Sequence, residues 1–282
     1  MTAVLEKVFK EIKLRAVKEY GDSLLLIIVF GSATRIEDFV PELSDVDVLL
    51  VVDDDCPLER IRFSEYYSLE SVKVSLITMR KSEFEESANI GTPLSHWAKL
   101  DSRMLYYSSP NVIKWFESIE PRLTDYTVSV FRRSAVVAYG IAAEYFFMNV
   151  WRRVLHHLYH SIRHALRYRS SLELRVVPAS NREVKLMAKK LKLHEAVELF
   201  EELVRVRARR KASFEVANRA MDRASIILSD LLNVKFPRWL HMHSLLKLLD
   251  EVSAISYEIE DDRVRANALV WIKSRGFVRV RL

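Results

Sequence analysis

The stretch LLLIIVFGSATRIEDFVPELSDVDVLLVV, residues 24–52, decides the fold of this protein. It begins with the apolar run Leu24–Phe30 and ends with a second one, Val46–Val52. Each run is too short for a helix and is bounded by polar residues, so both predict buried strands. The polar residues therefore gather where the first strand ends and where the second begins.

Asp45 and Asp47 are two residues apart at the start of the second predicted strand. Side chains at this spacing project from the same face of a strand, so both carboxylates face one point. Mg²⁺ prefers one or two carboxylates together with phosphate oxygens and water. The pair therefore predicts a magnesium site (Mn²⁺ fits the same ligands) for phosphoryl chemistry, whereas a lone pair of this kind is commonly just a solvated strand end.

Gly31 and Ser32 follow the first predicted strand. A glycine lets a phosphate approach the backbone, and a serine hydroxyl with nearby helix N-terminal amides can hold a triphosphate. The whole combination, with Arg35 and Ser44 in the connection, is far more specific than any part of it. It predicts a nucleotide site in which Gly31 and Ser32 hold the phosphates.

These motifs resemble the nucleotidyltransferase superfamily of DNA polymerase beta and kanamycin nucleotidyltransferase, in particular its minimal members. The matching segments are Phe30-Gly31-Ser32-Ala33-Thr34-Arg35 and Ser44-Asp45-Val46-Asp47, and the resemblance covers about residues 24–80. It implies an α+β fold, with a mixed sheet flanked by helices. It also implies transfer of a nucleoside monophosphate from a nucleoside triphosphate, expected to be ATP, to a hydroxyl with release of pyrophosphate. The resemblance implies Asp45 and Asp47 as catalytic metal ligands, and Gly31, Ser32, Arg35 and Ser44 as nucleotide-binding residues.

The chain departs from the family pattern at two positions. The glycine usual after the arginine is Ile36, and a third carboxylate, expected on a later strand, aligns with Ser75. A neutral hydroxyl is a poor magnesium ligand. Glu70 or one of the residues 53–55 would have to replace it. Two alternatives therefore stay open, an active transferase and a catalytically weak or inactive nucleotide-binding, antitoxin-like module.

Beyond residue 52 the apolar pattern predicts further elements. In the first part of the chain they are a helix over 3–20, a strand over 72–79, helices over 81–89 and 94–100, and a strand over 104–107. A break near Pro121 suggests a head domain over 1–120 and an all-α helical domain over 121–282 with a short terminal strand. The helices expected there span 128–169 with a weak point at Gly140, 181–191, 193–211, 212–232 and 239–256, and the strand covers 277–282.

Charge is distributed unevenly between the two predicted domains. Residues 1–120 hold 14 Lys/Arg and 21 Asp/Glu, whereas residues 121–282 hold 30 and 17. An acidic head suits a divalent metal, and a basic second part suits an anionic partner such as RNA, although solvated helix faces explain it as well. The identity of the acceptor stays open among a small molecule, a protein hydroxyl and RNA. Whether the protein forms a homodimer also stays open.

The helical part contains two histidine patterns. Arg152 and His157 have the R-x4-H spacing of ribonucleases of the HEPN group, an alternative function, although His and Arg are abundant enough here for a chance match. His156, His160 and His164 share one helical face, which favours a polar stripe over a metal site because no carboxylate completes the set. The basic run 205–211 suits nucleic-acid phosphates or an exposed helix end.

The compartment follows from the cysteine content and from hydropathy. The single cysteine, Cys56, cannot form an internal disulfide, and no apolar run approaches the roughly 18 residues needed to cross a bilayer. A cytoplasmic protein without a membrane partner is expected.

Overall fold

The computed structural model describes residues 2–35, 37–40, 42–207, 211–248, 251–273 and 275–281. The chain forms two compact units, one of Met1–Thr127 with Ala179–Glu183 and the other of Val128–Pro178 with Val184–Leu282. The chain thus passes between the units at three places, and the single boundary after residue 120 stays a prediction. Among the described helices, none is both long and apolar enough to cross a bilayer.

The first unit is built on a five-stranded mixed sheet in the order β3-β4-β2-β1-β5. Only β2 and β4 run parallel; the other neighbours are antiparallel. The strands are β1 Leu24–Phe30, β2 Val46–Val52, β3 Ser64–Leu69, β4 Val72–Arg80 and β5 Ser102–Tyr107, and the helices are α1 Thr2–Tyr20, α2 Lys81–Ile90, α3 Pro93–Leu100 and α4 Pro110–Ser118.

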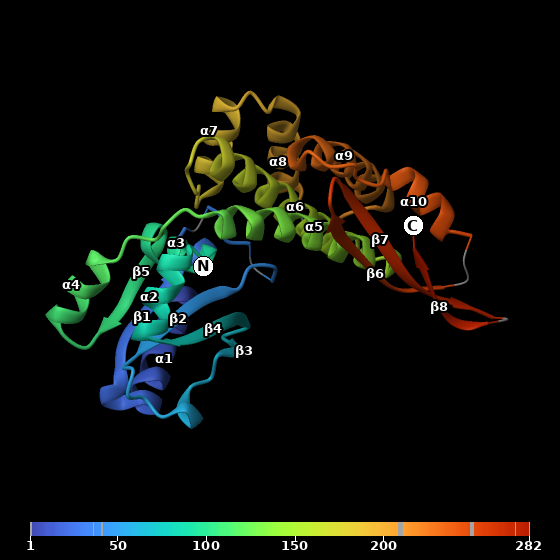
Figure 1. Ribbon diagram of the computed structural model, residues 1–282. Coiled ribbons are helices and arrows are strands. Elements are labelled where there is room, and N and C mark those ends of the chain that lie inside the picture. Colours follow the sequence, from blue (N-terminus) through green and yellow to red (C-terminus); the bar gives the residue numbers. More distant parts are fainter. Residues whose placement is uncertain are drawn as a thin grey trace. The chain divides into compact units, whose positions relative to one another are not determined.

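Helices cover both faces of this sheet, which explains its continuous apolar strands (Figure 1). On one face, Val8 and Ile12 of α1 pack in one cluster with Ile27 and Val48. On the other, Phe84 of α2, together with residues of α3 and α4, packs against alternate residues of the same strands. All seven residues of β1 are buried, as two covered faces require.

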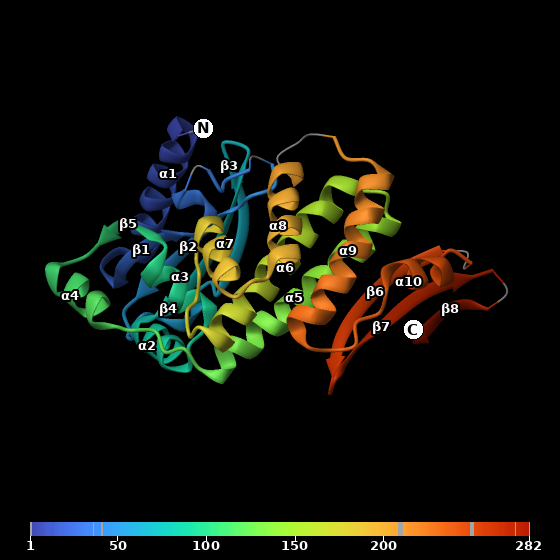
Figure 2. The same ribbon diagram turned by 90° about the horizontal axis from the view of Figure 1, so that it is seen from above.

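The second unit joins a helical bundle to a three-stranded antiparallel sheet in the order β6-β7-β8. Helix α6 lies against both α8 and α9 (Figure 2). The elements that lie wholly or mainly in this unit are α5 Asp125–Phe147, α6 Trp151–Glu173, α7 Asn181–Lys190, α8 His194–Arg207, α9 Phe214–Leu232, α10 Trp239–Leu246, β6 Glu251–Glu260, β7 Arg263–Ile272 and β8 Gly276–Arg281.

The predicted α+β class is confirmed, with β1 and β2 at their expected bounds, but the second part is not all-α. The helix expected over 239–256 ends at Leu246, and β6 begins at Glu251. Ile255 and Tyr257 are buried at alternate positions of β6, a period of two that the helical interpretation overlooked. The expected terminal strand exists as β8, and it pairs with β7, which was not predicted.

Gly140 does not interrupt a helix, contrary to the prediction. α5 continues through it, and the break falls at residues 148–150, where Asn149 has a φ of 57°. A Cβ atom at Gly140 would lie 3.3 Å from Cδ2 of Tyr257 in β6. The glycine therefore allows the sheet to approach α5 closely, which is a packing role.

Candidate functional site

Asp47 lies at the start of β2, between Phe30 of β1 and Ser75 of β4, which are its register partners. Its neighbours on the same face, Leu49 and Val51, pack in the cluster with α2, α3 and α4. Asp45 directly precedes the strand, and both aspartates are half-buried. The structure therefore places the predicted carboxylates at the start of the central strand β2, next to the end of β1.

Gly31 forms the turn directly after β1, with a φ of +75°. A Cβ atom there would lie 3.2 Å from Oδ2 of Asp47. The position requires glycine for its backbone conformation and for its closeness to the carboxylate. The structure thus brings Gly31 and Asp47 together from opposite ends of residues 31–47.

Ser32 belongs to the short 3-10 helix Gly31–Thr34 that follows this turn. Thr34 Oγ1 donates to the carbonyl oxygen of Gly31 at 2.7 Å and closes the turn. The amide of Gly31 donates to the backbone oxygen of Asp101 at 3.2 Å. That amide is therefore engaged within the protein. Ser32 is half-buried, and a contact of its hydroxyl with a phosphate stays a prediction.

Arg35 is held by two carboxylates that the sequence did not single out. Its Nε donates to Oδ2 of Asp38 at 3.0 Å, and its Nη1 is ion-paired with Asp101. Only 14% of the Arg35 side chain is exposed. Asp38 Oδ2 also accepts from the amide of Asn181 at 3.1 Å. These bonds tie the connection between β1 and β2 to the end of α3 and to the start of α7.

The spacing of three residues between Arg35 and Asp38 could have indicated the first ion pair. Nothing in the sequence indicated the pair between Arg35 and Asp101. The sequence predicted Arg35 as a ligand of the triphosphate. The structure pairs its guanidinium with two carboxylates, and a contact of Arg35 with a triphosphate stays a prediction.

Ser44 closes the loop before β2. Its Oγ accepts from the amide of Val40 at 2.9 Å, and its own amide donates to the Val40 carbonyl at 2.8 Å. The side chain therefore fixes the approach of the chain to Asp45. A direct contact between Ser44 and a nucleotide stays a prediction.

Ser75 is the residue beside Asp47 on β4, and it is buried, with 8% of its surface exposed. Tyr66 of β3 is the register partner of Ser75 and is 75% exposed, so one face carries Asp47, Ser75 and Tyr66 in a row. The third position next to the aspartates is thus a hydroxyl, as the alignment predicted. Tyr66 was missed because β3 itself was not predicted.

The acids considered as replacements for the third carboxylate lie elsewhere. Residues 53–55 follow β2 at its opposite end, where Asp54 Oδ1 accepts from the amide of Ser82 at 2.8 Å. That hydrogen bond, together with the Ser82 hydroxyl, lowers the pKa of Asp54. Glu70 lies in the turn between β3 and β4, five residues before Ser75. No group of three or more His, Cys, Asp or Glu side chains suited to a metal ion occurs in the part of the chain that the structure describes.

The residues present nevertheless fit a magnesium ion that takes two protein carboxylates. Asp45 and Asp47 would supply hard oxygen ligands at the start of β2, and glycine at residue 31 lets the backbone turn approach Asp47 closely. The same sheet face continues into a hollow of about 470 Å³, lined by Ile77 and Met79 of β4 and by residues of α2 and α3. Within the first unit, Ser75, the register partner of Asp47, is two residues along β4 from Ile77, which lines this hollow.

The predicted histidine residues of α6 are packed among rings and cations. His157 stacks on Tyr145 at 5.2 Å between ring centroids, and burial, followed by nearby Arg153, lowers its pKa to about 4. Consecutive rings of His156, His160 and His164 are 4.6 and 6.4 Å apart. Burial lowers all three pKa values, and the charged groups that lower them further are all basic.

These contacts show imidazoles packed against one another and against Tyr145, and the polar stripe expected on this face stays a prediction. The basic run is only partly described, since residues 208–210 lie outside the described ranges. Arg207 is buried, 3% exposed, with its guanidinium 4.0 Å from the centroid of Tyr159. It is therefore a packed side chain, unlike the solvated cation that the run suggested.

Comparison with models of protein families and with curated proteins gives no match. Solved structures that are similar to the chain include the following two. One is a nucleotidyltransferase-like protein from Exiguobacterium sibiricum, 17% identical, with a TM-score of 0.35, and the match covers 78% of this chain and 72% of that chain. The other is a spectinomycin adenyltransferase from Enterococcus faecialis with ATP and spectinomycin, 13% identical, with a TM-score of 0.49, covering 81% and 98%.

Both similar structures are of nucleotidyltransferase type. At these identities and TM-scores, what either protein binds is a property of that protein. The chemistry of this chain is argued from its own motif and geometry.

Proposed function

We propose that this protein is a magnesium-dependent nucleotidyltransferase. It would transfer a nucleoside monophosphate, most simply AMP from ATP, to a hydroxyl acceptor. The observation that carries the proposal is the closeness of the Gly31 turn to Asp47, with Asp45 two residues before it. A turn open to a phosphate and two carboxylates at one sheet edge are what a metal-bound triphosphate requires.

In this proposal Asp45 and Asp47 hold the metal, and the Ser32 hydroxyl contacts the triphosphate beside Gly31. When bound, the cation would neutralise charge on the phosphates and orient them. The acceptor oxygen attacks the α-phosphorus, the bond to the bridging oxygen of the β-phosphate breaks, and pyrophosphate leaves. The acceptor proton passes to water. Positioning of the two substrates supplies most of the rate in such a reaction.

Two further residues have supporting roles in the proposed site. Arg35 keeps the turn in place through Asp38 and Asp101. The exposed ring of Tyr66, in line with Asp47 and Ser75, is suited to contact the nucleoside.

The test uses ATP labelled at its α-phosphate, Mg²⁺ or Mn²⁺, and a panel of small-molecule, protein and RNA acceptors. We expect the double variant Asp45→Asn and Asp47→Asn to lose metal-dependent ATP binding in calorimetry and all transfer of label. Asp55→Asn, an exposed acid beyond the other end of β2, is the matched control and should retain both. Unchanged metal-dependent ATP binding in the double variant would end the proposal.

A second candidate function, a nucleotide-binding module without transfer, is favoured by Ser75. This buried hydroxyl occupies the place beside Asp47 where transferases of the resembled family carry an acid. Retained ATP binding with no transfer to any acceptor would favour this module. Transfer that depends on Asp45 and Asp47 would favour the enzyme.

A further inference from the structure

The outer face of the sheet β6-β7-β8 carries an unusual set of side chains. Val264, Ala266, Ala268 and Val270 of β7 are buried in the core of the second unit. The alternate residues Asn267, Leu269 and Trp271 project to the opposite side, which we call the open face. Register pairing extends it onto β6 and β8 in rows that include Trp271–Phe277, Ala254–Leu269–Arg279 and Ser256–Asn267–Arg281, followed by Glu258–Arg265.

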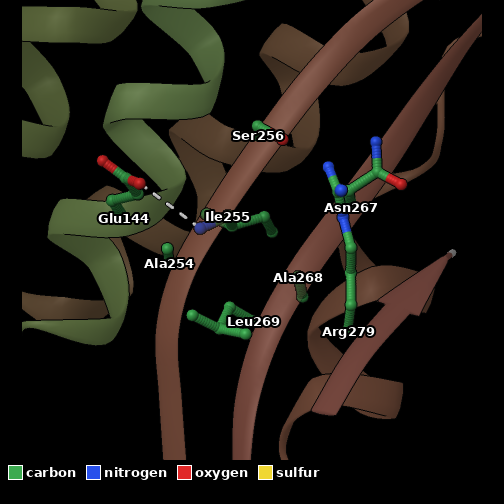
Figure 3. A pocket seen from close by; sticks show the side chains of 8 residues that line it. All are labelled: Glu144, Ala254, Ile255, Ser256, Asn267, Ala268, Leu269 and Arg279. Atoms are coloured by element: carbon green, nitrogen blue, oxygen red, sulfur yellow. Dashed lines mark hydrogen bonds between the residues drawn. The ribbon is translucent and has the colours of Figure 1, made fainter. Parts of the chain in front are cut away.

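Two of these rows enclose a hollow of about 340 Å³ (Figure 3). The side chains of Ala254 and Leu269 form part of its apolar lining. Its polar groups come from different elements, with Glu144 of α5 beside β6 and with Asn267 and Arg279 on β7 and β8. Glu144 Oε1 accepts from the amide of Ile255 at 3.3 Å, which fixes this carboxylate at the edge of β6.

The Trp271–Phe277 row lies next to the hollow, since each ring is two residues along its strand from a residue of the hollow. The ring centroids are 4.9 Å apart at an interplanar angle of 71°. Trp271 is 39% exposed and Phe277 is 63% exposed. Two large rings exposed side by side on a strand pair indicate a binding surface.

Charge favours an anionic occupant for the open face. Arg279 is exposed and has no carboxylate partner among the described residues. Residues 121–282 hold 30 basic and 17 acidic side chains.

We propose that the open face binds single-stranded nucleic acid. One base stacks on Phe277, the more exposed of the two rings, the next base enters the hollow, and Arg279 contacts the phosphate between them. In the hollow, the Asn267 amide and the Glu144 carboxylate hydrogen-bond the edge of the base. Adjacent rows are two residues apart, which corresponds to about 6.7 Å along the strand. This separation suits bases that are splayed apart, as in a single strand.

The proposal is independent of the carboxylate site on β2 and adds a second ligand class to the protein. Stacking on exposed aromatic rings tolerates any base, whereas a duplex keeps its bases paired and stacked. The surface therefore discriminates between single and double strands more than among sequences.

The experiment measures binding of fluorescently labelled ten-nucleotide single strands of RNA and of DNA, and of the corresponding duplexes, by anisotropy with the full chain. We expect Phe277→Ala to weaken single-strand binding about tenfold, since stacking contributes about 1–3 kcal/mol per base. Arg279→Ala should lower the salt dependence by about one phosphate contact. Phe63→Ala, which removes an aromatic side chain 57% exposed in the first unit, should leave binding unchanged.

Circular dichroism and thermal melting establish that each variant is folded, and Phe277→Leu keeps an apolar side chain without an aromatic face. Weakening by both Phe277→Ala and Phe277→Leu supports stacking. The variant Asp45→Asn with Asp47→Asn should bind the strands normally, which separates this proposal from the proposed function. The proposal is overturned if single strands do not bind, or if neither Phe277→Ala nor Arg279→Ala alters their binding. A dimer that Phe277→Ala dissociates, with nucleic-acid binding unchanged, would equally overturn it.

Discussion

Gly31 lies so close to Asp47 that a Cβ atom at residue 31 would sit 3.2 Å from Oδ2 of the aspartate. Gly31 directly follows β1 and Asp47 is the second residue of β2, and β1 and β2 are antiparallel neighbours. A backbone turn and a carboxylate are therefore fixed against each other by the sheet. The first prediction follows from this relationship.

Gly31→Ala should disable nucleotide binding beyond its effect on stability. The alanine adopts a left-handed conformation that costs about 1–2 kcal/mol and also crowds Asp47. Gly21→Ala is the matched control, because Gly21 has a φ of +54° with nothing within 4 Å of its Cβ position. Unfolding curves and ATP calorimetry compare the two. Equal ATP affinities would show that the closeness to Asp47 is unimportant.

Ser75→Asp should raise metal-dependent transfer, since it restores a carboxylate beside Asp47. Without metal, the new charge next to Asp47 should lower the melting temperature, and Mg²⁺ should recover it. Ser75→Asn keeps the size of the aspartate without its charge and should show neither effect. Thermal melts with and without Mg²⁺, together with label transfer, measure the outcome; identical behaviour of the Asp and Asn variants would contradict it.

Arg35→Ala should destabilise the first unit by about 3 kcal/mol, because it leaves two poorly exposed carboxylates, Asp38 and Asp101, without their cation. Arg15→Ala removes an exposed pair with Glu11 and should cost well under 1 kcal/mol. Denaturant unfolding measures both. In a double-mutant cycle, Asp101→Asn should cost less in the Arg35→Ala background than in the wild type, and additive costs would refute the coupling.

The second unit should lose stability as the pH falls from about 6.5 toward 4. Burial lowers the pKa of His157 to about 4 and also lowers those of His156, His160 and His164. The unfolded chain, with ordinary histidines near 6.5, therefore binds more protons in this range, so acid favours unfolding. His157→Asn should flatten the pH dependence by up to about 1.4 kcal/mol per pH unit. Replacing the exposed His241 should not, and unfolding curves across this pH range decide.

The strands of the first unit were predictable wherever burial is continuous. β1 and β2 are covered on both faces, so their sequences are apolar throughout and their ends are marked by polar residues. β3 is an edge strand with exposed alternate residues, and its sequence SEYYSL lacks such a run. β6 and β7 were missed because their strand character depends on pairing with each other and on packing against α5.

The sequence by itself determined the two central strands and the position of Gly31, Ser32, Asp45 and Asp47 at their ends. These features are local, since hydrophobic runs and turn residues act over a few neighbours along the chain. Only the tertiary structure decided that Arg35 is held by Asp38 and Asp101 and that Ser75 stands beside Asp47. It also decided that Trp271, Phe277 and Arg279 share an open face. Such relationships join residues from different strands and loops, and register and packing fix them only once the whole fold has formed.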